Sequence, residues 1–171
     1  MTEEDQTPAE QKDIFSGDPD DTGSIDAIVA ALYRGVSFTP DGEPEWDHLR
    51  RLFLPTARLV PPRADGNDKP VAVDVDTWLA ESRQSLKSGR SSFAETGFHE
   101  EEIARGSKRY GNLAQVFSVY RARRAPGDSE VVQRGVNSIQ LVKSRGRWWI
   151  ASIVWEVERP EAPIPEEYLH V

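Results

Sequence analysis

A chain of 171 residues falls in the size range of a single domain and can bury one hydrophobic core. Its formal net charge of -8, from 21 basic and 29 acidic side chains, disfavours nucleic acid and anionic membrane surfaces as partners. The chain has no cysteine, which excludes disulfides, thiolate metal sites and cysteine nucleophiles.

The first 23 residues are acidic, contain two prolines and lack the basic patch and apolar run of a signal peptide. We expect residues 1–23 to be a disordered leader. No apolar stretch of 18 residues occurs, so no membrane span is expected, and the absence of cysteine suits a reducing compartment. We therefore expect a cytoplasmic protein.

Two helices are predicted next. Ser24 is a suitable N-cap for a helix to about residue 37, because apolar residues then recur at spacings of three and four. After a turn rich in proline and glycine, residues 45–54 show helical spacing of Trp46, Leu49, Leu52 and Phe53, and Pro55 ends the helix.

A short strand and a third helix follow. Residues 57–60 read as a brief strand ended by two prolines, and the polar loop at 63–70 is expected to form a mobile rim. Asp74 or Asp76 is positioned to cap a helix that contains Trp78 and ends near the pair Ser88 and Gly89.

The second half of the chain changes to the alternating pattern of strands. We predict strands at 98–105, 112–124, 131–143 and 147–158, joined as a meander by turns such as 144–146. Residues 159–171, with three prolines, are expected to form an irregular tail. Three helices followed by antiparallel strands predict an α+β fold in which the helices cover one face of the sheet.

The last strand is apolar on both faces. Alternation puts Trp149, Ile153 and Trp155 on one side, and Ile150 and Val154 on the other. Since a sheet face exposed to water should be polar, a second surface is expected to cover the outer face. We predict a homodimer built sheet to sheet, disrupted by a charge at Ile150 or Val154.

The order of elements, with YRGVSFTPDGEPEWDHLRRLFLPTARLVPP and RGVNSIQLVKSRGRWWIASIVWEVE, resembles the nuclear-transport-factor-2-like (NTF2-like), SnoaL-like superfamily over residues 24–158. The stretches are similar to bacterial members without an established activity. The resemblance implies a cone-shaped cystatin-like roll, a curved antiparallel sheet around the helices. In ketosteroid isomerases, scytalone dehydratases and polyketide cyclases of this superfamily, the open end of the cone holds a pocket. Other members only bind partners or support assembly.

The resemblance to the isomerases implies roles for two residues. Tyr33, on the first helix, and Asn137, on a late strand, lie where those enzymes have their hydrogen-bond donors. Pro61 and Pro62 stand where the base should be, so the isomerase mechanism is incomplete. For both candidates a structural role is the alternative: a satisfied buried hydroxyl for Tyr33, and a structural hydrogen bond for Asn137.

Four further residues are candidates. His99 and Glu101 should share a strand face with Ile103, which would aim an imidazole and a carboxylate in one direction for proton transfer; an exposed strand face is the alternative. Trp78 and Trp155 are candidates for lining an apolar pocket, against the alternative that they only fill the core.

The functional expectation combines these residues. We expect a small-molecule-binding SnoaL-like protein with an apolar pocket and no cofactor or metal, since no histidine spacing typical of metal sites occurs. The alternative is a cofactor-free isomerase, dehydratase or cyclase acting on a hydrophobic carbonyl compound, with His99 or Glu101 as the base. A third possibility is an assembly module whose cone is filled by side chains.

Overall fold

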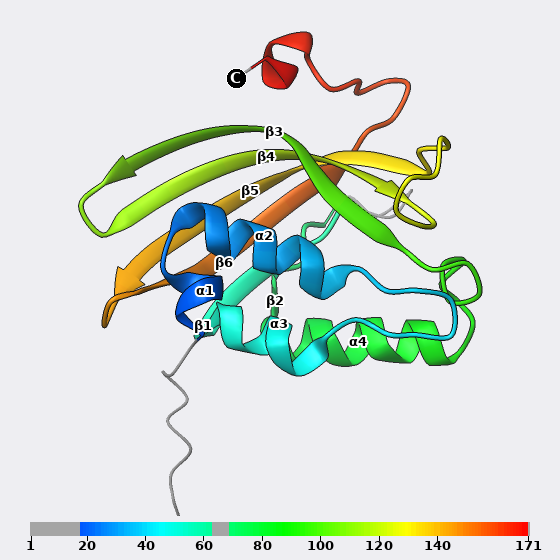
Figure 1. The fold of residues 1–171 in the computed structure, drawn as a ribbon, viewed down its shortest axis with the longest axis horizontal. Helices are drawn as coiled ribbons and strands as arrows, with labels where there is room; N and C mark the ends of the chain where they lie inside the picture. The colour runs from blue at the N-terminus through cyan, green and yellow to red at the C-terminus, as the bar shows by residue number, and fades with distance from the viewer. Residues whose placement is uncertain (1–17, 63–68, 171) are drawn as a thin grey trace, which may run out of the picture.

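The protein is a bent six-stranded sheet with helices on its concave face (Figure 1). The computed structural model describes residues 18–62 and 69–170. The strand order is β2-β1-β6-β5-β4-β3. The elements are α1 (Pro19–Thr22), α2 (Ile25–Val36), α3 (Trp46–Leu52), β1 (Phe53–Val60), β2 (Val73–Asp74), α4 (Val75–Lys87), β3 (His99–Tyr110), β4 (Leu113–Arg123), β5 (Gln133–Ser144), β6 (Arg147–Val157) and the 3-10 helix η1 (Glu166–Leu169).

The predicted helices form with the predicted caps. The Ser24 hydroxyl accepts a hydrogen bond from the Ala27 amide at 3.0 Å, and the Asp74 carboxylate accepts one from the Thr77 amide at 2.8 Å. An additional helical turn, α1, lies within the expected leader and is capped by Asp18; order therefore begins before Ser24, while residues 1–17 lie outside the described part. No helix in the described residues is long and apolar enough to cross a membrane.

The strand β1 differs from its prediction in both length and direction. The helix α3 ends at Leu52, and Phe53 is already extended (φ -98°, ψ 146°) because it pairs with Ile150 of β6. This pair runs parallel, so the sheet is mostly rather than wholly antiparallel. Since β1 joins β6 across almost 100 residues of chain, no local pattern could indicate its direction.

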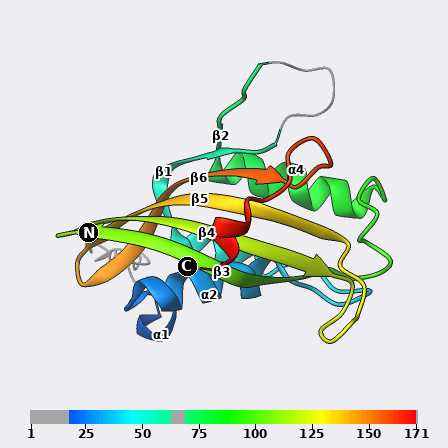
Figure 2. The ribbon, with the colours of Figure 1, turned by 90° about the horizontal axis from the view of Figure 1, so that it is seen from above.

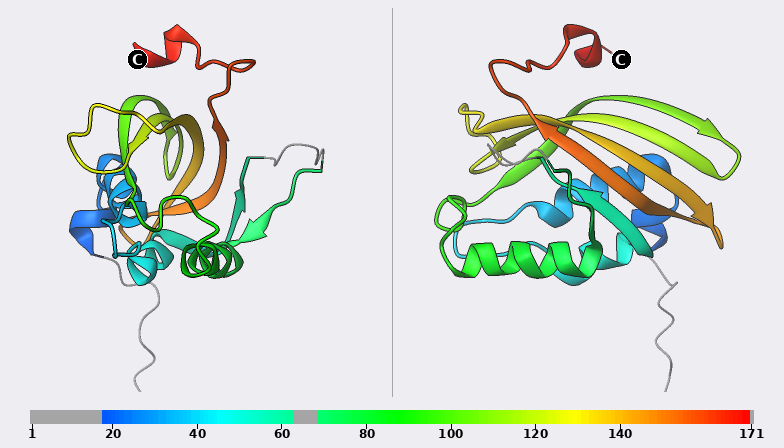
Figure 3. Two further views of the ribbon diagram at one scale, coloured as in Figure 1. Left: turned by 90° about the vertical axis from the view of Figure 1, so that its right-hand side faces the viewer. Right: turned by 180° about the vertical axis from the view of Figure 1, so that it is seen from behind.

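The meander of β3, β4, β5 and β6 is confirmed, with every neighbouring pair antiparallel. The turn between β5 and β6 uses Arg145 and Gly146, both with positive φ (51° and 80°). Two positive φ values are typical of a two-residue hairpin turn that matches the twist of the strands. The long strands curl over the helices, as seen from above in Figure 2 and from the side in Figure 3.

The prediction for the two faces of β6 is wrong because of a β-bulge. Leu141 pairs with Ile150, but Gln140 pairs with Ser152, so Ala151 is an extra residue and the alternation reverses there. Ile150 consequently faces the helices and is 1% exposed, while Val154 on the outer face is 48% exposed. Trp149 is buried (2% exposed) outside the main core cluster, with the Arg147 guanidinium 3.7 Å from its ring centroid.

The convex outer face is partly covered by the chain's own C-terminal segment (Figure 3). The ring of Tyr168 in η1 packs edge-on against Phe117 of β4, with ring centroids 5.1 Å apart. Residues 159–170 are otherwise irregular, as expected. Exposed apolar side chains remain on the sheet, including Leu113 (55%) and Val154. The sheet-to-sheet homodimer stays a prediction, with Ile150 removed from its surface.

Because of the bulge, we predict different costs for shortening two apolar residues of β6, Ile150 and Val154. The Ile150→Ala substitution should lower the free energy of unfolding by about 2–5 kcal/mol, because it leaves a cavity in the core. The Val154→Ala substitution should change it by about 0.5 kcal/mol or less, as is usual for exposed positions. Urea denaturation of the two variants measures both values, and equal losses would contradict the bulged register.

Candidate functional site

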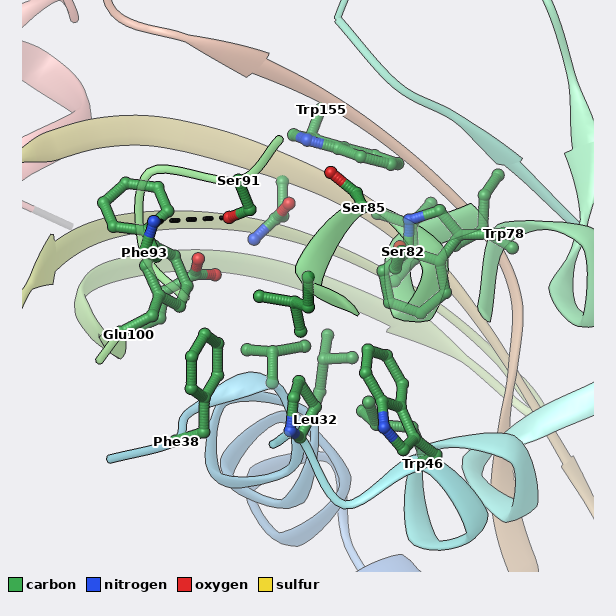
Figure 4. A pocket seen from close by; sticks show the side chains of 18 of the residues that line it. Leu32, Phe38, Trp46, Trp78, Ser82, Ser85, Ser91, Phe93, Glu100 and Trp155 are labelled. Carbon is green, nitrogen blue, oxygen red and sulfur yellow. Dashed lines mark hydrogen bonds between the residues drawn. The ribbon is translucent and has the colours of Figure 1, made fainter. Parts of the chain in front are cut away.

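An apolar cavity of about 350 Å³ lies between the helices and the concave face of the sheet (Figure 4). Leu32 and Val36 of α2 and Trp46 of α3 form one wall, and β6 contributes Ile153 and Trp155 to another. The helix α4 adds Trp78 together with the hydroxyls of Ser82 and Ser85. The remaining walls include five aromatic side chains: Phe38, Phe53, Phe93, Phe98 and Tyr120.

The carboxyl of Glu100 lines this cavity. It comes from the start of β3, where the backbone is fixed: the Glu100 amide donates to the Ser37 hydroxyl at 3.0 Å, and Phe38 and Phe98 exchange two backbone hydrogen bonds. Within residues 18–62 and 69–170 the carboxyl has no hydrogen bond or ion pair. The Glu100 side chain is partly exposed where it lines the cavity. Protein atoms nevertheless surround it on most sides and remove water from the carboxyl, and this burial raises the pKa of Glu100 to about 8.

A chain of hydrogen bonds connects α2 to the sheet beside the cavity. The Tyr33 hydroxyl lies 2.7 Å from the Ser118 hydroxyl, which donates in turn to the Glu102 carboxylate. Tyr33 therefore donates to Ser118 and accepts a hydrogen bond from the Asn137 amide nitrogen at 3.0 Å. Asn137 is 7% exposed and lines the cavity, so its amide oxygen and second amide hydrogen remain for another partner.

Two tyrosines next to Glu100 are held as neutral hydroxyls. The rings of Tyr33 and Tyr120 pack with centroids 6.4 Å apart, and Gln133 donates to the Tyr120 hydroxyl at 3.0 Å. Burial raises the pKa of both tyrosines above its usual value. A glycine at position 135 is required here, because a Cβ would lie 2.5 Å from the Tyr120 hydroxyl oxygen.

The structure brings the four predicted ligand-binding residues together. Trp78, Asn137 and Trp155 line the cavity, and Tyr33 is hydrogen-bonded to Asn137 directly beside it. The packing of Trp78 on Phe53, with centroids 6.4 Å apart, shows that it also belongs to the core.

The two predicted base candidates lie elsewhere. The Glu101 carboxylate accepts hydrogen bonds from Arg121 and Arg123 at 2.7 Å each. These contacts, and the hydrogen bond from Arg121 above all, hold the pKa of Glu101 below its usual range. His99 lies in a neighbouring hollow between α2 and β3, outside the cavity walls. Ile103, which alternation groups with them, is the extra residue of a second β-bulge and is 36% exposed.

Sequence reasoning missed Glu100, whose carboxyl is the only one among the described residues that line the cavity. Glu100, Glu101 and Glu102 are consecutive, so alternation alone does not show which of them points inward. Phe98 could have indicated the inward-pointing residue, because it lies two positions before Glu100 and a large aromatic side chain marks their shared strand face as the inner one. Among the described residues, no three His, Cys, Asp or Glu side chains gather to form a metal site.

Neither a protein-family model nor a curated protein matches the chain. Solved structures do. A protein of unknown function from Mycobacterium tuberculosis is similar over 85% of this chain and 86% of its own, with 12% identity and a TM-score of 0.57. A protein with a cystatin-like fold from Nostoc punctiforme, also of unknown function, covers 70% of this chain and 80% of its own, with 15% identity and a TM-score of 0.52.

An NTF2-like protein with a cystatin-like fold from Novosphingobium aromaticivorans aligns with 69% of this chain and 73% of its own, with 11% identity and a TM-score of 0.51. At these identities the likeness concerns the fold alone. The chain therefore has the cystatin-like, NTF2-like fold, as the sequence predicts. Function has to be argued from the site.

The Glu100 carboxyl makes stability depend on pH. Because its pKa rises from 4.5 in the unfolded chain to about 8 in the fold, the folded protein holds the proton more tightly, and its stability falls as pH rises through this window. The Glu100→Gln variant should gain stability relative to wild type between pH 5 and pH 8, by at most about 1.4 kcal/mol per pH unit.

Urea denaturation at both pH values measures this difference. The matched control is Glu101→Gln, whose wild-type carboxyl has a lowered pKa and is ionised throughout this range, so its difference from wild type should stay constant. A pH-independent difference for Glu100→Gln would contradict the unpaired, buried carboxyl.

Proposed function

We propose that this chain is a SnoaL-like protein that binds a largely apolar small molecule in the cavity, without a cofactor or metal. The observation that carries the proposal is a cavity with aromatic walls and only a few polar groups, among them Glu100, Asn137 and the two serines of α4. Its volume of about 350 Å³ lies within the range of small-molecule sites, roughly 300–1,000 Å³.

The shape of the interior supports binding over pure assembly. An assembly module would need only the outside of its cone, and its interior would be filled by side chains as densely as other protein cores. Here the large side chains Trp46, Trp78 and Trp155 border open space. The two serines on α4 also place small polar side chains where larger apolar ones would close the cavity.

Catalysis by proton transfer is the second candidate, favoured by the state of Glu100. A carboxyl with a pKa of about 8 is a stronger base than an ordinary one and still ionises near neutral pH. It would replace His99 and Glu101 as the base of a cofactor-free isomerase, dehydratase or cyclase acting on a hydrophobic carbonyl compound.

The proton transfer balances without a cofactor. The ionised Glu100 would take the proton from a carbon next to the carbonyl; the pair of the broken C–H bond would form a C=C bond, and the π pair of the C=O bond would move to the oxygen. The free amide hydrogen of Asn137 would stabilise that oxygen, and Glu100 would return the proton to another carbon of the ligand.

Binding is tested by filling the cavity. The neutral fluorescent probe N-phenyl-1-naphthylamine should brighten with wild-type protein, and Ser85→Phe should abolish the signal because its ring occupies the space beside Trp155. The control Gln84→Phe adds the same ring to the exposed side of α4 and should bind as wild type does. If both variants bind the probe equally, it does not enter the cavity.

Catalysis is tested by hydrogen-deuterium exchange next to the carbonyl of 4-phenylcyclohexanone, followed by NMR in D₂O. The wild-type rate should rise with pH up to about 8, where Glu100 becomes ionised. Glu100→Gln should slow exchange by about 100-fold or more, as expected for loss of a general base, while Glu101→Gln retains it. Equal rates for wild type and Glu100→Gln would exclude this role.

A further inference from the structure

The charge balance of the cavity is incomplete. Glu100 is the only Asp, Glu, Lys, Arg or His among the described residues that line it. Glu102, two residues further along β3, already has its partners in Arg105 and Ser118. Ionising a buried carboxyl without a counter-ion costs free energy, so a cation brought beside Glu100 would supply a partner that the described residues do not offer.

Aromatic rings surround the Glu100 end of the cavity. Phe93 and Phe98 pack with ring centroids 4.8 Å apart, and Phe38 lies 6.3 Å from Phe98. Figure 4 shows Glu100, Phe38 and Phe93 at one end, and Trp46 and Trp78 at the other. The faces of aromatic rings carry negative electrostatic potential and attract cations. The Glu100 carboxylate and the surrounding ring faces therefore both favour a positively charged ligand.

We propose that the cavity selects a hydrophobic organic cation, with an ammonium group paired to Glu100 and an apolar body between the tryptophans. This assignment rests on the proposed small-molecule function and names its ligand class. The free amide oxygen of Asn137 provides a further acceptor for an ammonium hydrogen. An anionic ligand would meet an unpaired carboxyl and a chain of net charge -8.

Binding of a cation must release a proton. Burial keeps most of Glu100 protonated at pH 7, and an ammonium placed beside it would favour the ionised form. The titratable groups that interact with Glu100 include Tyr33 from α2 and Tyr120 from β4. On its other side Glu100 borders the neighbouring hollow, which is also lined by Arg34, Glu45, His99, Glu101, Glu102, Arg105 and Arg124. Both tyrosines titrate far above neutral pH, and Glu102 is already ion-paired. Among the described acidic and basic residues only Glu100 lines the cavity that would hold the ammonium, so the proton released on binding is assigned to Glu100 and is tested with Glu100→Gln below.

Three ligands with one body test the inference: 3-phenylpropylammonium, 3-phenylpropan-1-ol and 3-phenylpropanoate, titrated calorimetrically at pH 7. The cation should bind about tenfold or more tightly than the alcohol, and the anion most weakly. Titration in two buffers of different ionisation enthalpy should show release of close to one proton with the cation and none with the alcohol.

Two variants assign the effect to the cavity. Glu100→Gln should remove the preference for the cation and the proton release, while the affinity for the alcohol changes little. Glu101→Gln makes the same chemical change one residue further, outside the cavity, and should behave as wild type. Equal losses in both variants would show that only the overall negative charge attracts the cation, which overturns the inference.

The remaining outcomes separate this inference from the function on which it rests. If the alcohol binds as tightly as the cation, or N-phenyl-1-naphthylamine binds while the cation does not, cation selection is overturned and the apolar binding site stands. If neither that probe nor any of the three ligands binds, the proposed function itself fails.

Discussion

The hydrogen bonds of Tyr33 fix the helix α2 over the sheet, and the rest of the site depends on them. One hydroxyl joins α2 to Ser118 of β4 and Asn137 of β5, residues 85 and 104 positions away along the chain. Because each of these polar groups is buried, losing one partner would leave the others unsatisfied in an apolar interior. The spacing between helix and sheet is therefore set by polar contacts, and the cavity beside them is kept open.

The position of the unpaired carboxyl follows from the same contacts. The end of α2 is tied to the start of β3 by the bond between Ser37 and Glu100 and by the paired backbones of Phe38 and Phe98. Glu100 is thus held with its side chain on the cavity side, where it cannot turn toward Arg121 and Arg123 as Glu101 does. Neighbouring glutamates acquire opposite chemistry because a strand directs successive side chains to opposite faces.

The sequence predicts those parts of the fold that local patterns determine. The caps at Ser24 and Asp74, the helical spacing of α2 and the alternation of the last four strands all lead to the observed elements. The bulges at Ile103 and Ala151 cannot be recognised from the alternation of apolar and polar residues. An extra residue shifts the alternation, so the faces assigned to the residues on its two sides no longer agree. This is why Ile150 was expected on the outer face.

The candidate site likewise contains residues that the sequence predicts and one that it does not. Tyr33, Trp78, Asn137 and Trp155 could be found because residue type and element order place them near the interior. Glu100 could not be separated from Glu101 and Glu102 without knowing which strand face Phe98 marks. That its carboxyl has no partner among the described residues follows from where all the other side chains lie, which only the folded structure shows.

The parallel pairing of β1 with β6 has a consequence for how the protein matures. Phe53 leaves the ribosome long before its partner Ile150, so the strand that carries it must wait until β6 has been synthesised. Contacts this distant in sequence slow folding, because a long loop must close before they form. Phe53 and Ile153 both border the cavity, so a nascent chain cannot hold a ligand until translation has passed the last strand.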